Sequence, residues 1–467
     1  MNATKQDLTS LAEWDAVETR ERIRTGSVST DEVLEAAITR AEASQHLGAI
    51  VASTYDRARR TSSDHKYGYF YGVPTFIKDL AQVAGAPTAW GSRASADYVS
   101  RKSDPITKRF EETGLVVLGK SACPELGLHA TTEPLGSAPC VNPWDLSRSS
   151  GGSSGGAASL VSAGVVPIAH GSDGGGSIRI PASCCGLVGL KPSRFRLDMA
   201  GSNLLPVNIA ADGVITRSVR DTIAFYEALE TKRPPKRVPA IGTVKHSSLK
   251  PLRIGIYVDT ATRSAVASDV KDAVRAAAKL CETLGHEIEE IPYPFYSGVN
   301  DDFLRFWCSL AWVQARTGWA MMQWGFDQSK LEPWTSGLIQ SFLNAKRDTF
   351  ASVKRLRTFA QTSADDMKRF DVFISPVLAE AAPKLGFMSG DVAFELVFER
   401  IRAYAAFTAV HNVTGCPALA LPLGKSADGL PIGVQFAAAH GRDRMLLALA
   451  LSLEEAQPWT GLAPPRA

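Results

Sequence analysis

The sequence predicts an α/β fold in which helices cover both faces of a central mixed β-sheet. From about residue 70, short apolar runs such as VPTFI and LVVL alternate with helical stretches and with turns rich in Gly, Ser and Pro. This alternation is typical of a largely buried sheet. The chain has 467 residues, of which 45% are hydrophobic and 21% charged, so one large core is feasible. We therefore expect a single domain over residues 1–467.

The first segment, residues 1–65, is predicted to contain helices. Gly26 ends one helix, and Ser29 and Glu32 form a capping box that opens the next, DEVLEAAITRAEA. Residues 66–232 follow as the core segment of the domain, where strands and helices alternate.

The second half of the chain begins with a Pro-rich surface connection over residues 233–250. A strand (LRIGIYV), a helix (SDVKDAVRAAAKLCETLG) and a strand (HEIEEI) follow, and they add an α/β unit to the sheet. Residues 300–370 are predicted to be helical and are rich in tryptophan. The chain then returns to the strands DVFISPV, ALALPL and IGVQFAAA and closes with the helix RDRMLLALALSLEEA.

Composition excludes several classes of function. The net charge is +3, from 51 basic and 48 acidic residues, and no basic stripe points to nucleic acid as a partner. The seven cysteines include no CxxC pair, so we expect neither a zinc site nor a disulfide framework. The polar N-terminus lacks the apolar run of a signal peptide, and no apolar stretch reaches the roughly 18 residues of a membrane span. These features predict a soluble, cytoplasmic protein.

One motif is misleading. The segment from Gly114 to Ser121, GLVVLGKS, satisfies the P-loop pattern of nucleotide-binding proteins. Its four central residues favour a buried strand over a phosphate-binding loop, and Pro124 leaves a poor helix start after Lys120. We expect no nucleotide site here.

Two glycine-serine clusters carry the candidate chemistry. GGSSGG (residues 151–156) and SDGGGS (residues 172–177) are joined by a helix-like stretch, 157–163, and a predicted strand, 165–169. Because apolar secondary structure flanks them, they are not expected to be a linker, and their glycines indicate close backbone approach. Gly174, Gly175 and Gly176 can turn successive N–H groups toward one point, and the N–H of Ser177 lies near a predicted helix start. The pattern predicts a serine nucleophile, Ser177, with an oxyanion hole formed by these four residues.

The base that would activate this serine has two candidates. Lys78 ends the strand GVPTFIK, where burial would lower its pKa and leave a neutral amine. Alternatively, Lys78 is a lysine that snorkels to the surface or pairs with Asp79. His170 is nearer to the serine in sequence, but it also fits a packed core histidine. The residues alone leave this choice open.

The combined pattern resembles the amidase-signature family of serine hydrolases, including bacterial stand-alone amidases. The resemblance is carried by GGSSGG, by D-x-G-x-S-[IV]-R-x-P, and by Lys78, Ser153 and Ser177 standing 75 and 24 residues apart. The NPW tripeptide at 142–144 and the late VTGCPALALPLG and GLPIGVQ segments also match. This resemblance covers about residues 10–460 and implies the amidase-signature fold.

The resemblance also implies roles for individual residues. Ser177 is the nucleophile, and Ser153, which follows a cis peptide bond, relays its proton to neutral Lys78. Residues 66–232 form the catalytic core, with Ser154 and Asp173 supporting the site and Arg179 anchoring it. The implied reaction is hydrolysis of carbon–nitrogen amide bonds through an acyl-enzyme on Ser177, with no metal and no cofactor.

The substrate is less well defined. The tryptophans of the predicted helical region either pack the core or form the wall of an apolar pocket; they are Trp307, Trp312, Trp319, Trp324 and Trp334. The candidate substrate-binding residues are Thr132, Trp307, Cys308 and Trp312. We expect a small-molecule aryl or aliphatic amide, with carbamates (urethanes) and esters as further substrates. The alternative is the glutamine amidase subunit of a tRNA-dependent amidotransferase, and the sequence leaves open whether the chain forms a homodimer.

Overall fold

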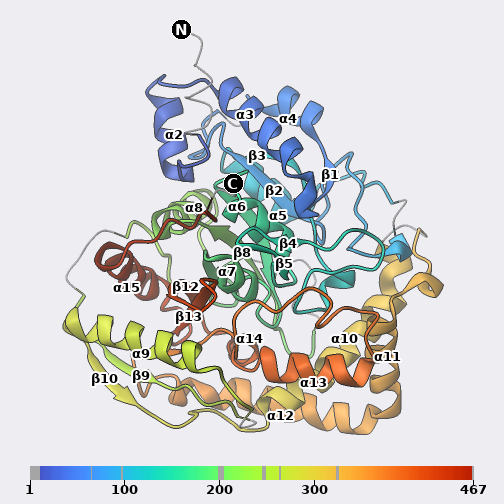
Figure 1. Cartoon of the computed structure of the whole chain (residues 1–467), viewed down its shortest axis with the longest axis vertical. Helices are drawn as coiled ribbons and strands as arrows, with labels where there is room; N and C mark the ends of the chain where they lie inside the picture. The colour runs from blue at the N-terminus through green and yellow to red at the C-terminus, as the bar shows by residue number, and fades with distance from the viewer. Residues whose placement is uncertain are drawn as a thin grey trace.

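The computed structural model describes residues 11–64, 66–95, 98–197, 205–244, 249–261, 264–321 and 325–464. Helices surround a large central sheet, with the N-terminal helices at one end of the molecule and α10–α13 at the other (Figure 1). Residues 1–10 of the predicted N-terminal helical segment lie outside the described residues, as does Trp324. In the part of the chain that the structure describes, no helix is long and apolar enough to span a membrane.

The central sheet has eight strands in the order β10-β9-β11-β13-β12-β7-β8-β6. Their bounds, in that order, are Glu287–Glu290, Arg253–Ile256, Val372–Pro376, Pro431–Ala437, Ala418–Lys425, Val188–Lys191, Ala211–Thr216 and Ile168–Asp173. Strands β10, β9 and β11 run parallel, whereas every pairing from β11 to β6 is antiparallel. The prediction of a mixed sheet is therefore confirmed.

Two smaller sheets accompany the large one. The first has the order β1-β3-β2, with bounds Ile50–Ser53, Val116–Ser121 and Pro74–Lys78. In it β2 and β3 run parallel, and β1 and β3 antiparallel. The second is the hairpin of β4 (Val141–Asn142) and β5 (Asp145–Ser149), which leads into the first glycine-serine cluster.

Helices cover both faces of the large sheet, as the sequence predicts. Along β12, Leu419 and Leu421 face a core cluster shared with α8, α9 and α15, whereas Ala420 faces a second cluster shared with α6 and α7. This alternation is the period of two expected for a strand buried on both sides. The helices around the sheet are α6 (Gly155–Ser162), α7 (Arg179–Cys185), α8 (Val219–Lys232), α9 (Ser268–Thr283), α14 (Ala409–Thr414) and α15 (Asp443–Ala456).

The remaining helices form the two ends of the molecule. The N-terminal helices are α2 (Ala16–Arg24), α3 (Thr30–Ala43) and α4 (Tyr55–Thr61), whereas α5 (Pro105–Glu112) belongs to the core segment and contacts α8. The tryptophan-rich end consists of α10 (Val299–Met321), α11 (Pro333–Asn344), α12 (Lys346–Asp366) and α13 (Phe394–Tyr404). The capping box is confirmed, because Ser29 Oγ accepts from the backbone N–H of Glu32 at 3.2 Å while Glu32 accepts from the Ser29 N–H at 2.8 Å.

Two predictions about strands have different outcomes. The P-loop-like segment forms the buried strand β3, as expected. The strand predicted over residues 165–169 is wrong in its bounds, because β6 spans Ile168–Asp173. Its pairing with β8 continues to Asp173, opposite Ala211, so the second glycine-serine cluster begins inside the sheet. Because the residues at the start of this cluster are polar, a search for apolar runs does not identify them as part of a strand.

Candidate active site

Lys78 lies at the end of β2, fully buried, and its amine contacts the first glycine-serine cluster. Nζ donates to Ser153 Oγ at 2.7 Å and to Ser172 Oγ at 3.0 Å. Burial in the core lowers the pKa of Lys78 to about 8. The alternative pairing with Asp79 does not occur, because Asp79 accepts from Lys120 Nζ at 2.8 Å. Because Lys78 is fully buried, the alternative that it snorkels to the surface is also excluded.

His170 has a structural role beside Lys78. Its Nδ1 accepts the backbone N–H of Lys78 at 3.2 Å, and its Nε2 lies 3.2 Å from Asp212 Oδ1. Both ring nitrogens are therefore engaged within β2, β6 and β8. The ring fixes the strand end that carries Lys78 and has no nitrogen left for a serine.

The two glycine-serine clusters are hydrogen-bonded to each other. The peptide bond between Gly152 and Ser153 is cis. The N–H of Ser154 donates to the carbonyl of Ser177 at 3.3 Å, and Ser154 Oγ accepts the N–H of Ser172 at 3.3 Å. Ser154 therefore joins the loop that carries Ser153 to the loop that carries Ser177.

Ser177 lies just before α7, with 7% of its surface exposed, and borders a cavity. Among the predicted oxyanion-hole donors, the N–H of Gly176 is committed to Asp173 Oδ1 at 2.7 Å. The N–H groups of Gly174, Gly175 and Ser177 have no hydrogen-bond acceptor among the described residues. Gly176 has a φ of 133°, and a Cβ at this position would lie 2.5 Å from Thr408 Oγ1, so only glycine fits there.

Asp173 and Arg179 form a fully buried ion pair beneath this loop. Arg179 donates to Asp173 from both Nε and Nη2 at 3.0 Å. Burial alone would raise the pKa of Asp173, but the Arg179 guanidinium and the Asn412 amide hold it below its ordinary value. The ionised carboxylate also accepts the N–H of Ile178 at 3.2 Å, which fixes the backbone on both sides of Ser177.

Residues from the last third of the chain complete this network, and sequence reasoning did not single them out. Arg179 donates to the carbonyl of Thr408 at 2.9 Å, to Gln435 Oε1 at 2.7 Å and to Asn412 Oδ1 at 2.6 Å. Thr408 Oγ1 in turn donates to the carbonyl of Gly175. The only signal in the sequence was the late VTGCPALALPLG and GLPIGVQ pattern, which contains Gln435 and begins just after Asn412.

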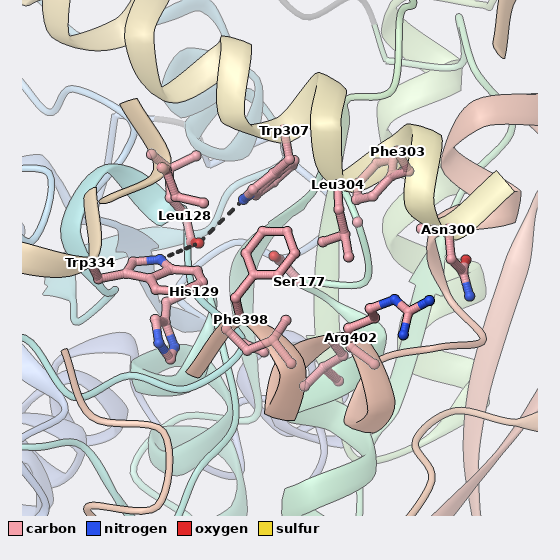
Figure 2. Close-up of a pocket in the computed structure, with 17 residues that line it drawn as sticks. Leu128, His129, Ser177, Asn300, Phe303, Leu304, Trp307, Trp334, Phe398 and Arg402 are labelled. Atoms are coloured by element: carbon pink, nitrogen blue, oxygen red, sulfur yellow. Dashed lines mark hydrogen bonds between the residues drawn. The ribbon is translucent and has the colours of Figure 1, made fainter. Parts of the chain in front are cut away.

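An apolar cavity opens in front of Ser177, between α10 and α13 (Figure 2). Its walls are aromatic and aliphatic, and its apolar lining includes Leu128, Phe303, Leu304, Trp307, Trp334, Leu338, Phe398 and Ile401. The indole N–H groups of Trp307 and Trp334 both donate to the Leu128 carbonyl, at 3.3 and 3.1 Å. These rings therefore present mainly carbon to the cavity.

The polar groups that line this cavity are few. Burial lowers the pKa of His129 to about 3, so its ring is neutral. Arg402 is the charged residue of the lining, and its guanidinium donates to Asp301 at 2.8 Å. Asn300 donates its amide to the Ala406 carbonyl at 2.7 Å. The cavity thus offers no unpaired charge among the described residues.

The predicted substrate-binding residues separate into two groups. Trp307 lines the cavity and stacks on Phe303, with ring centroids 5.4 Å apart. The other three do not line it. Trp312 packs on Phe342, Cys308 is buried with its pKa raised to about 11, and Thr132 donates to the Gly151 carbonyl at 2.8 Å. Thr132 thus supports the loop that carries Ser153.

Comparisons with known proteins agree with this geometry. A family model described as "Amidase" matches residues 32–447. The chain belongs to the amidase family. A putative amidase AmiC from Mycobacterium leprae is 41% identical over 96% of both chains. The 6-aminohexanoate-cyclic-dimer hydrolase of Pseudomonas sp. is 33% identical over 96% of both chains.

Solved structures of amidases show the same architecture. A structure of 6-aminohexanoate cyclic dimer hydrolase superimposes with a TM-score of 0.88 and 30% identity, over 96% of this chain and 98% of that one. The amidase-signature fold expected from the sequence is therefore confirmed. This amidase is an enzyme that hydrolyses carbon–nitrogen amide bonds.

Proposed function

We propose that this amidase hydrolyses amides of apolar aryl or alkyl groups through an acyl-enzyme on Ser177, and accepts carbamates and esters of similar shape. The observation that carries the proposal is the 2.7 Å hydrogen bond from buried Lys78 to Ser153, beside the cavity that Ser177 borders. A lysine whose burial favours the neutral amine can accept a proton from a serine hydroxyl.

In the proposed mechanism, Ser153 passes its proton to neutral Lys78 and takes the proton of Ser177. Ser177 Oγ then attacks the carbonyl carbon, and the N–H groups of Gly174, Gly175 and Ser177 stabilise the oxyanion. The carbon–nitrogen bond breaks as Ser153 returns a proton to the leaving amine. Water then attacks the acyl-enzyme by the same route, which releases the acid and restores Ser177.

The lining of the cavity supports an apolar substrate. Free glutamine carries an ammonium and a carboxylate, which would need partners of opposite charge when they leave water. The charged residue of the lining, Arg402, is already paired with Asp301, and His129 is neutral. This disfavours the glutamine amidase alternative.

The test is a pair of chromogenic substrates that both release 4-nitroaniline, an apolar acyl 4-nitroanilide and an O-alkyl 4-nitrophenylcarbamate. Initial rates are compared with the Ser177→Ala variant as the blank. Release that depends on Ser177 from either substrate supports the proposal, and the ratio of rates separates amidase from urethanase activity. Release from neither substrate, together with hydrolysis of glutamine, would favour the alternative.

A further inference from the structure

Two buried glutamates lie behind one wall of the apolar cavity. Glu125 belongs to the short helix η3 (Glu125–Gly127), Glu332 immediately precedes α11, and both side chains are buried. Both line a small cavity whose other lining residues include His129 and Trp334. These two rings also line the larger apolar cavity, so the two cavities share a wall.

The two carboxyl groups join the chain around η3 to the start of α11. Glu125 Oε2 accepts the backbone N–H of Glu332 at 2.8 Å, and its Oε1 accepts the hydroxyl of Ser92 at 2.5 Å. Glu332 Oε1 in turn accepts the backbone N–H of Leu135 at 2.7 Å. Each glutamate therefore binds the segment that carries the other.

The position of Trp334 depends on the same two segments. Trp334 is the second residue of α11, and its indole N–H donates at 3.1 Å to the carbonyl of Leu128, three residues after Glu125 (Figure 2). Its ring also packs edge-on against His129, with ring centroids 5.0 Å apart. A shift of the start of α11 relative to residues 125–135 would therefore move a ring that lines the apolar cavity.

The charges around the two glutamates do not balance when both ionise. Burial, and then the charge of Glu125, raise the pKa of Glu332 to about 7, and burial also raises the pKa of Glu125. Arg93 favours the ionised form of both, but no ion pair joins it to either one among the described residues. The small cavity adds no cation, because His129 is neutral and Glu133 is a further acid. Below pH 7 the pair therefore holds one proton, and above pH 7 both members are negatively charged.

We propose that Glu125 and Glu332 are positioning residues for the Trp334 ring, and that they hold it in place for the substrate only while the pair carries a proton. The inference rests on the proposed function, in which the apolar cavity binds the substrate, and neither glutamate contacts that substrate. Two buried carboxylates with no bound cation repel each other. The repulsion acts against the hydrogen bonds that Glu332 and Leu135 donate, so affinity for an apolar substrate falls as the pair ionises.

The test is to measure KM and kcat for an apolar acyl 4-nitroanilide between pH 6 and pH 8. If only the protonated pair positions Trp334, KM should rise about tenfold over this range, because the competent fraction of the enzyme falls about tenfold. The value of kcat should rise over the same range, as expected for Lys78 as the base, so the two constants report on different groups. Loss of a purely structural support would change KM by the same factor at every pH.

Glu332→Gln keeps an oxygen for the Leu135 N–H but cannot ionise, so its KM should stay near the wild-type value at pH 6 across the whole range. Glu454→Gln is the matched control. Burial also raises the pKa of Glu454 to about 7, but this side chain accepts the Val219 N–H at the start of α8, away from the cavity. Its KM should rise with pH as in the wild type. If Glu332→Gln does not fold, Glu125→Gln still tests the proposal, because removing the neighbouring charge should move the rise in KM to lower pH.

A wild-type KM that does not change with pH overturns the proposal, as does a rise that persists in Glu332→Gln or disappears in Glu454→Gln. Ser177→Ala separates this proposal from the one on which it rests. If release of 4-nitroaniline depends on Ser177 but KM does not change with pH, only the role of the glutamates is refuted. If the wild type releases no 4-nitroaniline, the proposed function fails and the inference fails with it.

Discussion

Replacing Lys78 with methionine removes the amine but keeps an unbranched side chain in the buried site. Burial lowers the pKa of Lys78 from 10.5 to about 8. Below pH 8 the folded protein therefore carries a buried ammonium at Lys78, and this charge is better solvated by water in the unfolded chain. Between pH 8 and 10.5 the unfolded chain binds more protons, so this residue makes folding more favourable as pH rises. Buried Lys78 thus lowers the stability of the protein at neutral pH.

The magnitude follows from the difference in pKa. A difference of about 2.5 units corresponds to about 3 kcal/mol of unfolding free energy, lost below pH 8 and regained as pH approaches 10.5. The methionine variant also loses the hydrogen bonds to Ser153 and Ser172, at a cost of about 1 kcal/mol. We expect Lys78→Met to be about 2 kcal/mol more stable than the wild type at pH 7. Above pH 10.5 it should be about 1 kcal/mol less stable.

Urea unfolding of both proteins at several pH values measures this difference. Because the other titrating groups are common to both proteins, the free-energy difference between them isolates Lys78. A difference that stays constant between pH 7 and 10.5 would refute the argument, since it would mean that Lys78 has the same pKa in the folded and unfolded states.

Three further predictions concern the loop and the cavity. Ser177→Ala should abolish turnover and labelling by a fluorophosphonate probe while the melting temperature changes by less than about 3 °C, and a labelled variant would point to another nucleophile. Arg179→Met leaves Asp173 buried without its cation, so urea unfolding should show a loss of about 3–5 kcal/mol, and kcat/KM should fall by about 100-fold or more; wild-type rates would show that the loop needs no anchor. Trp307→Ala should raise KM for an apolar acyl 4-nitroanilide about tenfold, whereas Trp312→Phe, away from the cavity, should not; equal effects would mean that the cavity does not bind the acyl group.

Local signals in the sequence were sufficient for the elements that carry Lys78 and Ser177. The apolar run before Lys78 and the glycines before Ser177 each predict their own backbone, because strand and turn preferences act over a few residues. Whether His170 has a free ring nitrogen could not be predicted locally. It depends on His170 Nδ1 accepting the backbone N–H of Lys78, a contact between residues 92 positions apart.

The tryptophan-rich region shows a different limit. Trp307 and Cys308 are neighbours on α10, and both are apolar enough for a core or a cavity. Successive helix residues point about 100° apart, so one of them faces the cavity while the other faces the core. Periodicity identifies the apolar faces of a helix but not what each face contacts. That is decided by α11 and α13, whose positions depend on the whole fold.

The buried Asp173–Arg179 pair, which anchors the loop of Ser177, has a consequence for how this enzyme is made. Lys78, Ser153 and Ser177 are translated early in synthesis. The residues that accept hydrogen bonds from Arg179, which are Thr408, Asn412 and Gln435, are translated much later. Until residues 408–435 have left the ribosome, Arg179 lacks the acceptors that hold it in place beside Asp173. If Ser177 is the nucleophile as proposed, the growing polypeptide carries it without its anchored loop. Hydrolytic activity would then begin only when the last third of the protein has been synthesised and folded onto the rest.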